Sequence, residues 1–118
     1  MKHYEVRYLA SARKDLYDLL HFLVEKESPA RASDVLNQIR KLCDDLQSMP
    51  QRGHVPPELE EVGSKRFLEL HFKPYRIIYQ VSDPIVYIHI VCDGRRDMQS
   101  LLRTRLLSVG LNHTTEEA

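Results

Sequence analysis

The sequence is poor in the residues on which many cofactor, metal and disulfide sites depend. It has no tryptophan, two cysteines and four glycines among 118 residues. The glycines form no phosphate-binding loop, neither CxxC nor HExxH occurs, and the six histidines are not spaced as a metal-binding pair. These absences predict a protein that uses no metal ion and no cofactor.

The sequence also lacks a long hydrophobic run. No stretch approaches the roughly 18 apolar residues that span a bilayer, so we expect no contact with membranes. Residues 1–10 contain no apolar core of a signal peptide. Cys43 and Cys92 stand apart among apolar residues, which is typical of reduced, buried thiols. These features predict a cytoplasmic protein.

Net charge of one sign is absent as well. The 17 basic and 17 acidic residues balance, which disfavours a protein that coats nucleic acid by bulk charge. The balance hides an uneven distribution. Residues 1–63 hold nine basic and eleven acidic residues, residues 64–109 hold eight and four, and the tail adds two glutamates. The positive charge is therefore concentrated in the second half, where it can attract an acidic partner.

The first half of the chain has the periodicity of one strand and two helices. Aromatic and β-branched residues alternate with charged ones over residues 3–9, which predicts a short strand. Apolar residues then recur at helical spacing over residues 11–27 and 29–50. Ser28 and Pro29 are residue types that favour a helix start. Because the connection is only about two residues long, we expect an antiparallel helix hairpin.

The second half changes to the period of strands. A long loop with a helical turn after Pro57 is expected over residues 51–64. The next apolar runs predict an antiparallel meander and a last helix, at residues 65–72, 75–81, 85–92 and 97–109. The predicted fold is α+β, in the order β-α-α-β-β-β-α, with the hairpin on one face of the sheet. We expect a single domain over residues 1–109 and a flexible acidic tail over 110–118.

Arginines are the most prominent candidate binding residues of the positive half. Guanidinium groups bind phosphates and carboxylates through two parallel hydrogen bonds. Arg76 begins the middle strand of the meander, and Arg95 and Arg96 follow its last strand. We therefore expect them to approach one another at one end of the sheet. Arg103 and Arg105 lie on the last helix. The simpler alternative is that most of these arginines are solvated or pair locally, for instance Arg96 with Asp93 or Asp97.

His71, His89 and Asp93 are the candidate acid–base residues. An imidazole titrates near neutral pH and can transfer protons. Strand parity predicts that both histidines lie on the sheet face away from the helix hairpin. Ordinary half-buried histidines and an aspartate that caps a turn are the alternatives.

Five short motifs follow one another along the chain. They are Ala12-x-x-Asp15-Leu16, Ser28-Pro29-x-x-Ala32, Leu46-x-x-Met49-Pro50-x-x-Gly53, PYRIIYQV at 74–81 and DGRRD at 93–97. In this order and spacing they resemble the ParE/RelE superfamily of type II toxin–antitoxin toxins, over residues 4–107. The resemblance implies a small α+β toxin that is held inactive by an antitoxin encoded beside it.

The RelE branch of that superfamily cleaves mRNA on the ribosome without a metal, by means of lysines and arginines on the sheet. Arg76 and Arg95 match this pattern, whereas Phe67 and Glu69 stand at its two lysine positions. Leu101 stands where that branch has a tyrosine. The chain thus resembles a RelE toxin without its catalytic set. An RNase that uses these two arginines with His71, His89 and Asp93 is the alternative hypothesis.

The ParE branch resembles the chain more closely, through the corner of residues 94–97 that leads into the last helix. Those toxins poison DNA gyrase by binding, which requires no catalytic residues. The residues that we expect to contact the target are Arg95, Arg96, Arg103 and Arg105. We expect no sequence-specific DNA binding by this chain alone.

The resemblance also implies a cognate antitoxin as partner. We expect it to lay an amphipathic segment over the helix hairpin and part of the sheet. The predicted contacts are Leu20, Phe22 and Leu23 of the first helix with Arg76 and Tyr79 of the sheet. A degenerate toxin that only binds its antitoxin and co-regulates its operon is a further alternative.

Overall fold

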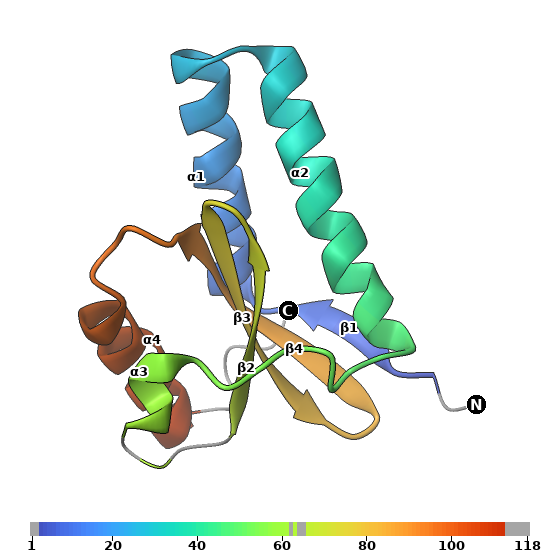
Figure 1. The fold of residues 1–118 in the computed structure, drawn as a ribbon, viewed down its shortest axis with the longest axis vertical. Helices are drawn as coiled ribbons and strands as arrows, with labels where there is room; N and C mark the ends of the chain where they lie inside the picture. Colours follow the sequence, from blue (N-terminus) through green and yellow to red (C-terminus); the bar gives the residue numbers. More distant parts are fainter. Residues whose placement is uncertain (1–2, 62, 64–65, 113–118) are drawn as a thin grey trace.

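The structure is a computed structural model that describes residues 3–61, 63 and 66–112, with the backbone alone for 107–112. Its elements follow the predicted order (Figure 1). They are β1 (Glu5–Tyr8), α1 (Ala10–Lys26), α2 (Pro29–Asp44), the 3₁₀ turn η1 (Asp45–Gln47), α3 (Pro57–Glu60), β2 (Phe67–Phe72), β3 (Tyr75–Ser82), β4 (Ile85–Asp93) and α4 (Met98–Asn112). The α+β prediction is confirmed, including the short helical turn at Pro57.

The four strands form one mixed sheet in the order β1-β4-β3-β2. β2, β3 and β4 make the predicted antiparallel meander, with a register shift at Ile78 and Tyr79. β1 pairs with β4 in parallel, from Glu5 opposite Ile85 to Tyr8 opposite Ile88. β4 is therefore an interior strand, which explains its nearly continuous apolar sequence.

The helix hairpin covers one face of the sheet and extends beyond it (Figure 1). The buried residues between them are apolar and include Ala12, Leu23, Val35, Ile39, Ile77, Tyr79, Val86 and Ile88. The Ser28 hydroxyl accepts the Arg31 backbone N–H at 3.0 Å, so the predicted cap of α2 is confirmed. α1 begins at Ala10 after Leu9, whose side chain provides no cap.

The opposite face carries a second apolar cluster beneath α4 and α3. It contains Phe67, Ile78, Ile90, Cys92, Met98, Leu102 and Leu106, with Leu59 of α3 at its edge. α4 continues to Asn112, beyond the predicted end at residue 109, because a glycine inside a helix weakens it without ending it. The predicted tail from residue 113 onward lies outside the described residues. Within the described ranges, no helix is long and apolar enough to cross a bilayer.

Asp15 of α1 joins both layers to the edge of β4. β1 covers this edge only as far as Ile88, and beyond it Asp15 Oδ2 accepts the Val91 N–H at 3.0 Å. Arg105 of α4 binds the two Asp15 oxygens at 3.2 and 3.1 Å and donates to the His89 carbonyl at 2.5 Å. These charge-assisted hydrogen bonds fix α4 against the sheet.

Candidate functional site

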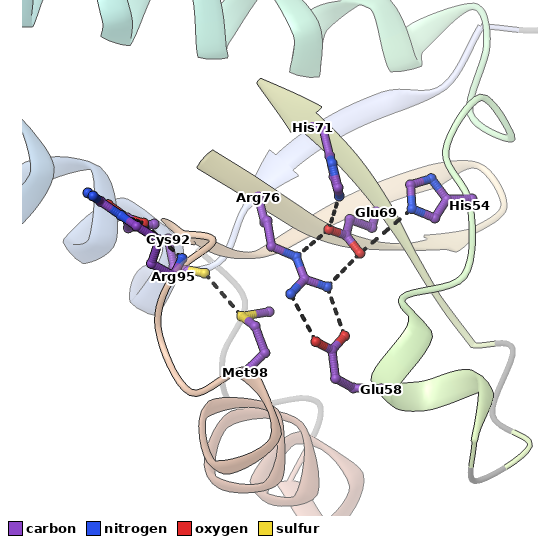
Figure 2. Close-up of polar contacts among 9 residues, drawn as sticks. His54, Glu58, Glu69, His71, Arg76, Cys92, Arg95 and Met98 are labelled. Atoms are coloured by element: carbon purple, nitrogen blue, oxygen red, sulfur yellow. Dashed lines mark hydrogen bonds and ion pairs between the residues drawn. The ribbon is translucent and has the colours of Figure 1, made fainter. Parts of the chain in front are cut away.

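Arg76 lies at the centre of a charged cluster on the sheet face away from the hairpin (Figure 2). It stands opposite His71 in the β2–β3 ladder, and Glu69 lies two residues before His71 on the same face. Arg76 Nε contacts Glu69 Oε2, and Nη2 donates to Oε1 at 2.8 Å. Its Nη1 and Nη2 also donate to Glu58 of α3, at 3.0 and 2.8 Å. The guanidinium of Arg76 is therefore hydrogen-bonded by two carboxylates.

The cluster is screened from water. The Glu69 side chain is 0% exposed, that of Arg76 12% and that of Glu58 23%. Hydrogen bonds to Glu69 and Glu58 raise the pKa of Arg76, and the bond from Arg76 lowers the pKa of Glu58. With neutral histidines the formal charge is −1. A phosphate at Arg76 would have to displace at least one carboxylate.

Tyr79 anchors the segment that leads to the cluster. Its hydroxyl donates to the Pro50 carbonyl at 2.8 Å and accepts the Gly53 N–H at 2.9 Å. A Cβ at Gly53 would lie 2.6 Å from the Glu69 carbonyl oxygen, so only glycine fits there. The next residue, His54, exchanges both backbone hydrogen bonds with Glu69, at 3.1 and 2.7 Å.

This bridge brings together three potential metal ligands, His54, Glu69 and His71. One ligand atom of each lies within 4.8 Å of the others. His54 Nε2 is 3.9 Å from Glu69 Oε1, and His71 Nε2 contacts Glu69 Oε2. The spacing of histidines in the sequence predicts no metal pair. The three residues come together only through the long-range β-bridge between His54 and Glu69. The local signal was Glu69-x-His71, which places both side chains on one strand face.

An open pocket of about 490 Å³ borders the cluster. Its lining residues are Pro57, Glu58, His71, Lys73, Pro74, Tyr75, Arg76, Gly94 and Arg95. Arg76 and Arg95 thus line the same pocket at one end of the sheet. A Cβ at Gly94 would lie 3.0 Å from the Pro74 carbonyl oxygen and 3.1 Å from Arg76 Cδ, so glycine lets this corner approach Arg76.

The other predicted acid–base residues have separate environments. His89 is 3% exposed; its Nε2 lies 3.1 Å from Gln80 Oε1, and its ring meets Phe67 edge-on. Burial, helped by Arg105, lowers the pKa of His89 to about 4. Asp93 binds Arg95 Nη2 at 2.7 Å, and that hydrogen bond lowers the pKa of Asp93. His71 therefore lines the pocket while His89 is enclosed in the layer beneath α4.

The predicted target-binding arginines divide into two groups. Arg95, Arg96 and Arg103 are exposed at the corner after β4 and on α4. Arg105 turns inward to Asp15, so its role in the free chain is to position α4.

The predicted antitoxin contacts divide in the same way. Leu20 and Phe22 are exposed on α1, as are Tyr17 and Val24. Leu23 and Tyr79 are buried in the core of the free chain, and Arg76 is bound by Glu58 and Glu69. Leu23 belongs to the apolar stripe that the hairpin turns toward the sheet, and the polar end of Tyr79 is used by the anchored loop.

Solved structures of toxin–antitoxin systems are similar to the chain, among them the following two. The chromosomal ParDE toxin–antitoxin system from P. aeruginosa gives a TM-score of 0.64 at 16% identity, over 77% of this chain and 96% of that chain. The RelBE2 toxin–antitoxin complex from Mycobacterium tuberculosis gives 0.55 at 25% identity, over 77% and 98%.

Of the two sequence comparisons, one gives a match. No curated protein matches the chain significantly. Residues 6–98 match the family described as the ParE toxin of the type II toxin–antitoxin system parDE. That match spans most of the described fold, from β1 to the start of α4. The chain belongs to the ParE toxin family.

Proposed function

We propose that this ParE-family toxin poisons DNA gyrase by protein–protein contact and that a cognate antitoxin neutralises it. The observation that carries the proposal is the pairing of Arg76 with Glu69 and Glu58. An arginine already bound by two carboxylates is a poor site for a scissile phosphate. Inhibition by binding, in contrast, does not require a free Arg76 side chain.

Cleavage of RNA would need an acid, a base and cations that stabilise the transition state. Among the described residues, the predicted members of such a set are already engaged. Arg76 is neutralised, Asp93 binds Arg95, and His89 is enclosed with a pKa of about 4. These contacts support binding over catalysis.

The proposed gyrase contact is the exposed arginine group at the end of β4 and on α4. Arg96 and Arg103 are exposed, and Arg95 has a side chain that is 83% exposed. A cationic surface of this kind suits an acidic patch on a protein partner and speeds the encounter. We expect the inhibition to weaken at high salt.

The test is DNA supercoiling by gyrase in the presence of the antitoxin-free chain. We expect inhibition by the wild type and at least about tenfold weaker inhibition by the Arg96→Glu, Arg103→Glu double variant. Arg40→Glu, on an exposed site of α2, is the matched control and should inhibit as the wild type does. Normal supercoiling at a large excess of wild-type chain would overturn the proposal.

One observation favours an mRNA endonuclease as the second candidate. The pocket holds Lys73, Arg76 and Arg95 beside an exposed His71. Primer extension on mRNA after induction decides between the two functions. Cut transcripts that disappear in a His71→Ala variant would favour the nuclease. An effect on neither supercoiling nor transcripts would indicate a toxin that only binds its antitoxin.

The antitoxin contact is proposed for the exposed apolar residues of α1. Tyr17, Leu20 and Val24 follow helical spacing along one side of α1, and Phe22, which is 56% exposed, lies on another side of the same helix. We expect the Leu20→Ser, Phe22→Ser double variant to bind the co-expressed antitoxin at least about tenfold more weakly. Arg13→Ser, at an exposed polar site on α1, is the control. Unchanged affinity of the double variant would place the contact elsewhere.

A further inference from the structure

We propose that His54, Glu69 and His71 form a binding site for a divalent transition-metal ion, with Zn²⁺ as the expected ion. His54 comes from the segment before α3, whereas Glu69 and His71 come from β2 (Figure 2). The site would join that segment to the sheet. This inference goes beyond the proposed action on gyrase and does not depend on it.

The backbone holds the three side chains in place. His54 and Glu69 exchange both of their backbone hydrogen bonds, so they lie directly opposite each other. His71 follows two residues later on the same strand face. The Tyr79 hydroxyl ties down the chain just before His54. Ligands on such fixed backbone positions lose little freedom when an ion binds.

The distances suit an ion between the three side chains, which would draw His54 slightly inward and separate His71 slightly from Glu69. The three ligand atoms lie within 4.8 Å of one another, and His54 Nε2 is 3.9 Å from Glu69 Oε1. Tetrahedral Zn²⁺ with bonds of about 2.0–2.1 Å separates its ligands by about 3.3 Å. The His54 and His71 side chains are 59% and 57% exposed, so both rings have room to turn. The same exposure leaves a fourth position for water.

The donor set and its surroundings also favour such an ion. Two imidazoles and one carboxylate are ligands that zinc uses in proteins. Glu69 is fully buried and hydrogen-bonded to Arg76. Carboxylates that bind metal ions are commonly held by such a hydrogen bond from a residue that does not itself bind the ion. A carboxylate has about four lone-pair sites, so Glu69 can keep Arg76 while it binds an ion.

The net charge of the cluster also favours a divalent cation. Glu58 neutralises the guanidinium of Arg76, which would otherwise repel a second cation. Together with Glu69 the formal charge is −1, and a divalent ion reverses its sign. Because His71 also lines the pocket, the ion would add positive charge at the pocket rim.

The test is calorimetric titration of the tag-free full chain with ZnCl₂. We expect one equivalent to bind, and His54→Ala and His71→Ala each to weaken the affinity at least about tenfold. His21→Ala, which removes an exposed histidine of α1, should change nothing. Replacement by Co²⁺ should give visible absorption bands typical of nitrogen and oxygen ligands, without thiolate bands from the cysteines.

Two results would overturn the site: no saturable binding of Zn²⁺ in the micromolar range, or equal affinity in the wild type and both histidine variants. Glu69→Gln tests the carboxylate and should lose affinity with an unchanged circular dichroism spectrum. If that variant does not fold, the two exposed-histidine variants still decide. Metal binding is measured without gyrase or antitoxin, so its failure is distinct from failure of the proposed function.

Discussion

The two faces of the sheet are built on different principles. The face under the helix hairpin is buried by apolar side chains such as Val35, Ile39 and Ile88. The face under α4 is apolar only in part, and at the α3 end it holds Glu69 and Arg76. Apolar contacts are non-directional and tolerate adjustment, whereas a buried ion pair depends on both partners being present.

The two faces also differ in what they leave accessible to a partner. The hairpin face secures the fold, and its inner residues are inaccessible to a partner. The opposite face presents the pocket, the corner that carries Arg95 and Arg96 (the arginine corner), and His71. It also contains a buried charge cluster, which is stable only when all of its partners are present. Substitutions on the two faces should therefore fail in different ways.

The largest expected effect is that of Arg76→Ala. It leaves Glu69 buried without its cation, which we expect to cost about 3–5 kcal/mol in the free energy of unfolding, measured by urea denaturation. The Arg76→Met, Glu69→Leu double variant removes both charges and should recover most of that loss. A cost below about 1 kcal/mol for Arg76→Ala would contradict the difference between the faces.

Ile39→Ala tests the hairpin face. Ile39 is 0% exposed, so its truncation leaves a cavity and should cost about 2–5 kcal/mol in urea denaturation, against about 0.5–1.5 kcal/mol for Ile39→Val. Because no charge is involved, the loss should be the same at low and high salt. A strong salt dependence would show that the hairpin face also relies on charge.

His89 predicts a pH dependence that belongs to the α4 face. Burial lowers its pKa from 6.5 to about 4, so between these values the unfolded chain binds a proton that the folded chain excludes. Stability is therefore complete above about pH 6.5 and declines as the pH falls toward 4, by at most about 3 kcal/mol. Urea denaturation across this range should show a shallower slope for His89→Gln; an unchanged slope would assign the dependence to other groups.

Arg95→Ala should have the smallest effect on stability. It borders the same pocket as Arg76, but its side chain is 83% exposed and its pair with Asp93 is open to solvent. Exposed ion pairs contribute little, so we expect no measurable shift of the urea midpoint. A clear shift would mean that the arginine corner is part of the folded core.

The sequence predicts the elements better than the site, because periodicity reports local structure. The order of elements, the Ser28 cap and the facing of Glu69 and His71 follow from spacing alone. The approach of Glu58 and His54 depends on a loop that Tyr79 holds by its hydroxyl, and no local pattern reports that contact.

The same limit applies to buried polar groups. Glu69 stands at a lysine position of the RelE pattern, but its burial and its contacts with Arg76 and His71 could not be read from the strand. Arg105 has the residue type of a surface contact, and only the fold turns it toward Asp15. Leu23 and Tyr79 are predicted as partner contacts, and their burial in the core likewise could not be read from the sequence.

We propose that this toxin acts by contact and that its Arg76 cluster is not catalytic. The most direct measurement is gyrase supercoiling with the wild type beside the Arg76→Met, Glu69→Leu variant, after circular dichroism has shown that the variant is folded. We expect both chains to inhibit supercoiling at similar concentrations. Supercoiling that the wild type leaves unchanged, or that only the charged cluster can inhibit, would contradict it.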